Sequence, residues 1–237
     1  MSHPRFDLIT FDLDDTLWPC LPAIMAAERR LFEWLRGRLP GMEDVHTIET
    51  LRDARRRLMS EHPEIAHDLT RVRRHVLERL FEEYGGNPAD VEEGMALFLD
   101  QRNRVQLYQD VRPVLSALRR RYTLISVTNG NADVGRIGIA DLFHHSLSAA
   151  EAGAARPAPA LFECALQLAD VEPGNALHVG DDPVRDVQAA RGLGLTAVWM
   201  DRNGQAWPGD LAPPHRRVAD LFELQAWLDD RAPVDTV

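Results

Sequence analysis

The sequence has little cysteine and no long apolar run. Only two cysteines, Cys20 and Cys164, occur in 237 residues, which is too few for a disulfide framework. No apolar segment approaches the length that spans a membrane, and no apolar leader precedes the first predicted strand. We therefore expect a cytoplasmic protein with reduced thiols and no membrane partner.

Positive charge is also scarce, with 27 Lys and Arg against 37 Asp and Glu and a formal net charge of −10 at pH 7. Proteins that bind nucleic acid normally present a basic face, so this balance argues against nucleic acid as a partner. A small anionic substrate stays open, because a metal ion determines the field inside a site more than the net charge does. The length suffices for one or two domains with a real hydrophobic core.

The first strong signal is an apolar segment that runs directly into acidic residues. Residues 6–10 are largely apolar and β-branched, which predicts a buried strand of a parallel sheet, and Asp12 and Asp14 follow it. These aspartates are two positions apart, so in an extended chain their side chains point to the same side. Two neighbouring carboxylates need a cation or a shared proton, and Mg²⁺ suits carboxylate and phosphate oxygens. An acidic helix cap is the alternative interpretation.

Residues 18–110 show helical periodicity and contain no convincing strand. Segments with apolar residues at helical spacing, bounded by glycine and proline signals, are 24–35, 51–59, 69–84 and 90–105. We predict an all-helical cap over this range.

From residue 111 onward, predicted strands and helices alternate. The predicted strands are 122–128, 176–179 and 196–200, and the predicted helices are 113–121, 157–169, 184–193 and 218–228. This alternation is typical of a parallel sheet covered by helices on both faces. The expected fold is therefore α/β: a Rossmann-like doubly wound core of residues 1–17 and 111–237, with the cap of residues 18–110 inserted after the first strand.

Polar residues stand where several predicted strands end, and one cation precedes a predicted helix. They are Asp12 and Asp14; Thr128 and Asn129; Asp181, Asp182 and Asp186; and Arg156. Because the carboxyl ends of parallel strands lie at one edge of a sheet, these side chains can converge although they are distant in sequence. Two acidic strand ends, a hydroxyl and a cation together indicate a metal- and anion-binding site rather than a set of helix caps.

This set resembles the haloacid dehalogenase-like hydrolase superfamily, whose members are mostly Mg²⁺-dependent phosphatases. The family's first motif, Asp-x-Asp-x-Thr, stands at residues 12–16, its second is Thr128, and its fourth, Gly-Asp-x-x-x-x-Asp, stands at residues 180–186. The third motif departs from the pattern: relatives typically have Lys-Pro-x-Pro, and this chain has Arg156 before Pro157. Arginine keeps the positive charge but is bulkier and planar. A surface arginine in a degenerate motif is the alternative.

The resemblance implies a phosphomonoester hydrolase that works through an aspartyl-phosphate. Asp12 would attack phosphorus, and Asp14 would protonate the departing alcohol and then accept a proton from water. Mg²⁺ would be held by Asp12, by the backbone carbonyl of Asp14 and by Asp181. Dehalogenases of the family lack an acid at the position of Asp14, because a departing halide needs no proton, so Asp14 favours phosphate esters.

Further positions would bind the phosphate and order the site. Thr128, Asn129 and Arg156 would contact the phosphoryl oxygens. Asp186 would orient Arg156 or a metal-bound water rather than bind the ion, and Asp182 is the alternative to either neighbouring acid.

The segments around the motifs, and residues 63–71 of the cap, look like bacterial phosphatases that act on flavin mononucleotide and on the phosphoribitylamino-pyrimidine intermediate of riboflavin synthesis. A small phosphorylated metabolite with a ring and a phosphate is therefore the expected substrate. Candidate contacts are Trp18, His67, Arg71 and Arg74. Packing at the cap hinge is the alternative for Trp18, and a solvated helix face with acidic partners four residues on is the alternative for the arginines.

Other functions stay open at this point. A phosphotransferase or phosphomutase of the same fold would use the same residues. The replacement of Lys by Arg156 is also compatible with a catalytically weakened module that binds a metal or a metabolite. His178 is predicted to be a buried structural histidine. The sequence does not distinguish a monomer from a homodimer.

Overall fold

The structure is a computed structural model of the chain and describes residues 6–231. It divides into two compact units. The first comprises the chain up to Pro19, Gln106–Asn129 and the chain from Gly138 on, and the second comprises Cys20–Val105 and Gly130–Ile137. No helix within residues 6–231 combines the length and the apolar character that a membrane span needs.

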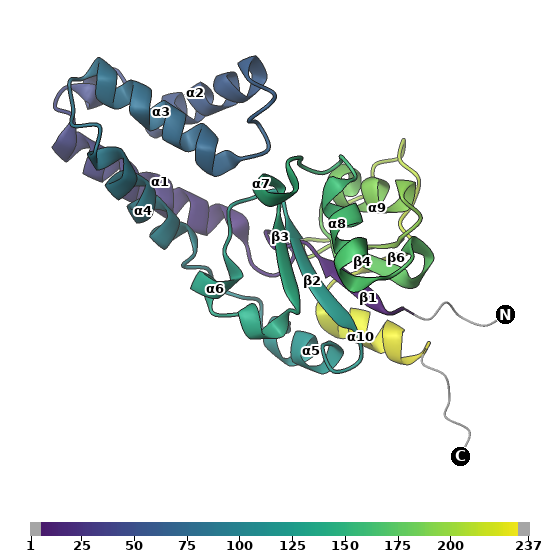
Figure 1. The fold of residues 1–237 in the computed structure, drawn as a ribbon. Helices are drawn as coiled ribbons and strands as arrows, with labels where there is room; N and C mark the ends of the chain where they lie inside the picture. Colours follow the sequence, from purple (N-terminus) through teal and green to yellow (C-terminus); the bar gives the residue numbers. More distant parts are fainter. Residues whose placement is uncertain (1–5, 232–237) are drawn as a thin grey trace. The chain divides into compact units, whose positions relative to one another are not determined.

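The first unit is built on a six-stranded sheet in the order β3-β2-β1-β4-β5-β6, in which all neighbouring strands are parallel (Figure 1). The strands are β1 (Leu8–Phe11), β2 (Thr123–Thr128), β3 (His145–Ser148), β4 (Ala176–Gly180), β5 (Thr196–Met200) and β6 (Arg216–Val218). The helices of this unit are α5 (Val111–Leu118), α7 (Ala149–Ala152), α8 (Ala160–Ala169), α9 (Ala189–Gly192) and α10 (Leu221–Asp229), with short turns η2 (Ala140–Leu142), η3 (Pro173–Asn175) and the π-helical η4 (Pro183–Gln188). Helices α1 to α5 lie between β1 and β2 in the chain, so the predicted fold class is confirmed.

Strand β1 lies at the centre of the sheet, and all of its residues are buried. Its last residue, Phe11, pairs with Ser126 of β2 and with Val179 of β4. The backbone N–H of the next residue, Asp12, donates to the carbonyl of Val179 at 2.9 Å. This register brings the acidic segment that follows β1 beside the one that follows β4.

The second unit is helical. It contains α1 (Cys20–Arg38), η1 (Met42–Asp44), α2 (Ile48–Glu61), α3 (Leu69–Glu83), α4 (Asp90–Arg102) and the short α6 (Val134–Ile137). The apolar stripes of α1 to α4 pack into one core, as their helical spacing predicts. The unit begins two residues later and ends five residues earlier than the predicted range 18–110. It also includes Gly130–Ile137, where Asp133 N–H donates to Asn103 Oδ1 at 2.7 Å.

Two predicted helices begin later than their sequence signals suggest. The helix predicted from residue 157 begins at Ala160, because Ala158 precedes a proline and such a residue disfavours helical conformation. The helix predicted from residue 218 begins at Leu221, where the Asp220 side chain accepts a hydrogen bond from the N–H of Glu223. Val218, where the helix was predicted to begin, is instead the last residue of β6.

The two edge strands each start next to a histidine that replaces one ladder hydrogen bond. His144 N–H donates to Leu124 O at 2.8 Å, and Leu124 N–H donates back to His144 Nδ1 at 3.0 Å. His215 and Ala197 make the same pair, both at 3.0 Å. Each ring must be neutral at Nδ1 to accept. Burial lowers the pKa of both histidines, and a nearby arginine lowers it further.

We expect these histidines to make stability fall on acidification. The unfolded chain takes up protons near pH 6.5, whereas the folded histidines do so only at lower pH, so protonation favours unfolding in that window. The double variant His144→Asn/His215→Asn keeps an acceptor but does not titrate. Urea unfolding from about pH 7.5 to about pH 5.5 should show a smaller loss of the free energy of unfolding in the variant. Equal losses in both proteins would contradict this role.

Candidate active site

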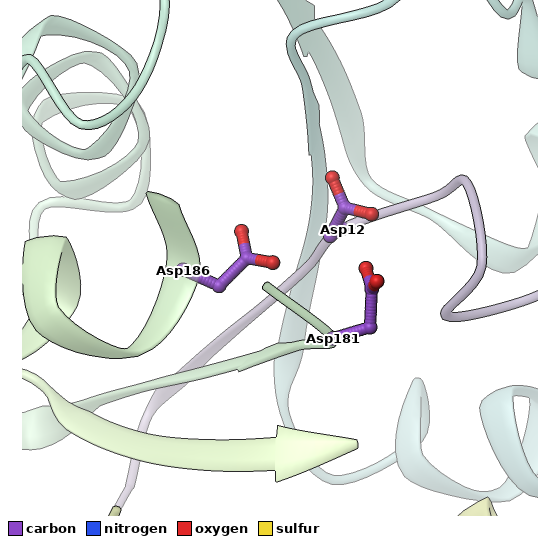
Figure 2. A group of neighbouring side chains, drawn as sticks. All are labelled: Asp12, Asp181 and Asp186. Atoms are coloured by element: carbon purple, nitrogen blue, oxygen red, sulfur yellow. The ribbon is translucent and has the colours of Figure 1, made fainter. Parts of the chain in front are cut away.

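Three carboxylates meet at the carboxyl edge of the sheet. Asp12 follows β1, Asp181 follows β4 and Asp186 lies in the π-helical turn after it. One carboxylate oxygen from each lies within 4.8 Å of the other two, and Figure 2 shows the three side chains converging. Asp12 and Asp186 are buried and Asp181 is half-buried. The strand ends therefore bring together acids that are up to 174 positions apart in sequence (12 to 186).

Arg156 occupies the space between two of these acids. Its guanidinium donates from Nη2 to Asp12 and from Nη1 to Asp186, and only 4% of the residue is exposed. The alternative of a surface arginine is therefore wrong. Asn129 Oδ1 accepts from Arg156 N at 2.8 Å and from Nε at 3.3 Å, and Asn129 Nδ2 donates to Arg156 O at 2.9 Å. The residue after β2 thus holds the arginine at both its backbone and its side chain.

The charges of this cluster do not balance. Three carboxylates and one guanidinium leave an excess of two negative charges in a poorly solvated place. Burial raises the pKa of Asp12 well above its usual range; Arg156 opposes this rise, and the other two acids add to it. Burial and repulsion from Asp186 and Asp15 raise the pKa of Asp181 to about 7. This donor set of crowded oxygens could hold a divalent cation.

Asp186 is the acid whose negative charge is best supported. Burial alone would raise its pKa, but Arg156 and a hydrogen bond from His178 outweigh burial and lower the pKa to about 2. His178 is completely buried, with Nε2 3.2 Å from Asp186 Oδ1 and Nδ1 2.9 Å from Thr10 Oγ1. Burial lowers the pKa of this histidine. A neutral ring that donates from Nε2 and accepts at Nδ1 satisfies both partners.

The local backbone explains Gly180, the last residue of β4, and Asp182 in the segment that follows. A Cβ at Gly180 would lie 2.3 Å from Cγ of Asp186, so only glycine allows the aspartate to fold back over the strand end. Asp182 N–H donates to Asp186 Oδ2 at 2.9 Å. The Asp182 carboxylate itself accepts from the N–H groups of Val184 and Arg185, each at 2.8 Å, and so caps the turn.

The segment after β1 places its other polar residues differently. The Asp14 carboxylate is not one of the three that converge, and it accepts from Trp18 Nε1 at 2.9 Å. Trp18 is completely buried, which matches the packing alternative and leaves no ring surface for stacking in this conformation. Thr16 Oγ1 donates to Asp181 Oδ1 at 3.4 Å. Thr128 is buried at the end of β2.

The remaining substrate-contact candidates belong to the helical unit. His67 is half-buried and Arg71 is exposed, with its N–H donating to the α3 cap Asp68 at 2.9 Å. Arg74 Nε donates to Glu92 of α4 at 2.7 Å. Its observed partner is therefore on the neighbouring helix rather than four residues along the same one.

Sequence reasoning missed two side chains that contact the acidic segments, Trp199 and Arg202 at the end of β5. Both donate to backbone carbonyls. A bond to a carbonyl leaves no trace in residue spacing, because every residue offers one.

Comparison with known proteins places the chain in a family. The model of haloacid dehalogenase-like hydrolases matches residues 6–194. The chain belongs to the haloacid dehalogenase-like hydrolase family. The resemblance stated from the motifs is confirmed by this match.

Curated relatives and solved structures agree on the family and carry different names. The chain is 32% identical over 228 residues to the 5-amino-6-(5-phospho-D-ribitylamino)uracil phosphatase of Escherichia coli (strain K12), which covers 93% of this chain and 95% of that protein. It is 38% identical over 158 residues to the phosphoserine phosphatase of Thermus thermophilus, covering 64% and 63%. A 2-haloacid dehalogenase structure from Pseudomonas syringae pv. Tomato DC3000 shares 38% identity and a TM-score of 0.89 over 96% of this chain and 100% of that one. The expectation of an enzyme of this family is confirmed by the family match, and both of these curated relatives are named as phosphatases.

Removing the guanidinium should leave two buried acids without their partner. We expect Arg156→Met to lower the free energy of unfolding by about 3–5 kcal/mol, because a buried charge loses its counter-ion. Urea unfolding in the presence of EDTA measures this loss. The matched control is Arg185→Met, which breaks an exposed ion pair with Asp182 and should cost less than about 1 kcal/mol. Equal losses would show that the buried pairs do not stabilise the fold.

Proposed function

We propose that the protein is a Mg²⁺-dependent phosphomonoester hydrolase with an aspartyl-phosphate intermediate. One observation carries the proposal: three acids, two of them buried and one half-buried, converge beside one guanidinium and leave a formal excess of two negative charges. Such a cluster suits a divalent cation and a transferring phosphoryl group. An acidic helix cap, the alternative interpretation, needs only one side-chain acceptor and does not require three acids and a guanidinium to converge.

The residues of the site fit a metal ion. Asp12 and Asp181 would hold it, together with the backbone carbonyl of Asp14. Asp186 is engaged by Arg156 and His178, which suits an orienting role better than direct ligation. When bound, the cation neutralises repulsion between the nucleophile and the phosphate.

The reaction then needs two acids from one segment. The carboxylate of Asp12 attacks phosphorus, the P–O bond to the substrate alcohol breaks, and Asp14 donates a proton to the departing oxygen. Water subsequently attacks the aspartyl-phosphate, Asp14 accepts its proton, and inorganic phosphate leaves. Trp18 Nε1, which donates to Asp14, helps to hold the acid in place.

Three residues would bind the phosphoryl oxygens. The Thr128 hydroxyl and the Asn129 amide would contact one oxygen, and Arg156 would contact another. The hydrogen bonds between Asn129 and Arg156 support this role, since they already couple the two groups.

The expected substrate is a small phosphorylated metabolite such as flavin mononucleotide or a ribitylamino phosphate of the riboflavin pathway. The similarity to the Escherichia coli enzyme over 93% of the chain supports it. His67, Arg71 and Arg74 are the candidate contacts, whereas the completely buried Trp18 packs in the fold and donates to Asp14. A 2-haloacid dehalogenase is the second candidate, because of the 38% identity to the Pseudomonas syringae structure. The acid at Asp14 favours the phosphatase.

A purified-enzyme assay separates the two candidates. We expect phosphate release from flavin mononucleotide or the ribitylamino phosphate to exceed release from phosphoserine, and no halide release from 2-chloropropionate. Asp12→Asn should lower turnover by more than about 10³-fold, because it removes the nucleophile. Halide release without phosphate release would establish the dehalogenase. Equal rates on all phosphates would refute the narrower substrate.

The variant Asp14→Asn tests the general-acid step. A general acid contributes about 10²- to 10⁴-fold when the leaving group needs a proton. The variant should therefore lose far more activity on alkyl phosphates than on p-nitrophenyl phosphate, whose phenolate leaves without protonation. Equal losses on both would contradict the role of Asp14.

Metal binding should be measurable without turnover. Relative to EDTA-treated protein, Mg²⁺ at 100 times its dissociation constant should stabilise the fold by about 2.7 kcal/mol. Asp181→Asn should lose this gain while its metal-free form is no less stable, because a half-buried carboxylate that Asp186 and Asp15 repel is gone. Asp220→Asn, which keeps the α10 cap, should respond to Mg²⁺ like the parent. Thermal unfolding with and without Mg²⁺ gives the comparison, and full stabilisation of Asp181→Asn would refute the ligand assignment.

A further inference from the structure

Two side chains at the end of β5 hold the backbone of both acidic segments. Trp199 Nε1 donates to the carbonyl of Asp181 at 2.8 Å. Arg202 donates to the carbonyl of Thr16 from Nε at 3.2 Å and from Nη2 at 2.9 Å. The first carbonyl belongs to the segment after β4, and the second belongs to the segment after β1. Strand β5 thus supports the site from outside the motifs.

The two contacts converge on one carboxylate. Thr16 Oγ1 donates to Asp181 Oδ1 at 3.4 Å. Arg202 therefore fixes the residue whose hydroxyl bonds the Asp181 carboxylate, while Trp199 fixes the main chain of Asp181 itself. Movement of either support would displace the same oxygen atoms.

Arg202 is itself held firmly. Its Nη1 donates at 2.6 Å to Asp110, which is 2% exposed and also accepts from Leu221 N–H at 2.6 Å. The guanidinium carbon lies 4.2 Å from the ring centroid of Tyr108, and Tyr108 N–H donates to Leu17 O at 3.0 Å. The side chain of Arg202 is 8% exposed, so it acts inside the fold and not as a surface charge.

We propose that Trp199 and Arg202 are positioning residues that orient Asp181 for the divalent cation. The inference rests on the proposed function, in which Asp181 is a metal ligand. Partners that orient a ligand typically change metal affinity or activity by about 10- to 100-fold when they are removed.

The chain offers a matched control for each residue. Trp207 packs edge-on against Trp199 with ring centroids 5.0 Å apart, and its Nε1 donates to Leu211 O at 3.1 Å, away from the acidic segments. Trp199→Phe and Trp207→Phe each remove one indole donor to a backbone carbonyl. Only the first of these carbonyls belongs to Asp181.

Arg217 is the matched control for Arg202. Arg217 is ion-paired with the buried Asp201 and lies 5.0 Å over the Trp199 ring. Arg202→Lys and Arg217→Lys both keep a positive charge near an aspartate. Only the first loses the fork that holds the Thr16 carbonyl.

Two readouts on the full chain test the inference. The first is the Mg²⁺ concentration that gives half of the maximal rise in melting temperature, and the second is kcat and KM on the best phosphate ester. Trp199→Phe and Arg202→Lys should need about tenfold more Mg²⁺ and lose kcat with KM unchanged. Trp207→Phe and Arg217→Lys should melt earlier but keep the parent's Mg²⁺ requirement and kcat.

Two other outcomes would overturn the inference, and they differ in whether the proposed function stands. If the parent hydrolyses phosphate and all four variants respond to Mg²⁺ alike, the positioning role is overturned and the proposed function stands. If the parent is neither stabilised by Mg²⁺ nor active, the proposed function is overturned and this inference with it.

Discussion

The site depends on the buried guanidinium of Arg156, which lies between the buried carboxylates of Asp12 and Asp186. Asp12, Asp181 and Asp186 share a small volume, and charges withdrawn from water are costly unless they are paired. Arg156 reaches two of these acids with separate nitrogens, while its Nε faces Asn129. An ammonium group carries its three donors on one nitrogen, whereas the guanidinium spreads its donors over three nitrogens. The planar side chain of Arg156 therefore reaches three partners with three separate nitrogens.

The residues around that cation divide the acids into two kinds. His178, Gly180 and Asp182 all serve Asp186: the first donates to it, the second makes room for it, and the third donates its N–H to it. That acid stays ionised and engaged. Asp12 and Asp181 have raised pKa values and accept from fewer protein donors than Asp186 does. A bound cation would therefore stabilise the ionised forms of these two acids. The same cluster thus contains a fixed part and a part suited to an ion.

The sequence predicted what depends on pattern and missed what depends on contacts with the backbone. Buried apolar runs identified β1, β2, β4 and β5, and parallel strand ends predicted that Asp12 and Asp181 would converge. The edge strands β3 and β6 were not predicted, because they are short and polar and each pairs with a single neighbouring strand. Trp199 and Arg202 escaped because they bind carbonyls, which every residue has. The helix at Ala160 started late because of a proline, which was visible in the sequence.

The edges of the sheet also bear on how this protein behaves in a crowded solution. Strand β6 is three residues long and exposes Arg216 and Arg217, and β3 is a four-residue strand with an exposed His145. Long, flat, apolar edges recruit strands from other chains and seed aggregates. Short edges that carry basic side chains offer little template for such recruitment. The polar edge strands β3 and β6, which are hard to recognise in the sequence, therefore protect the sheet from edge-to-edge association with other molecules.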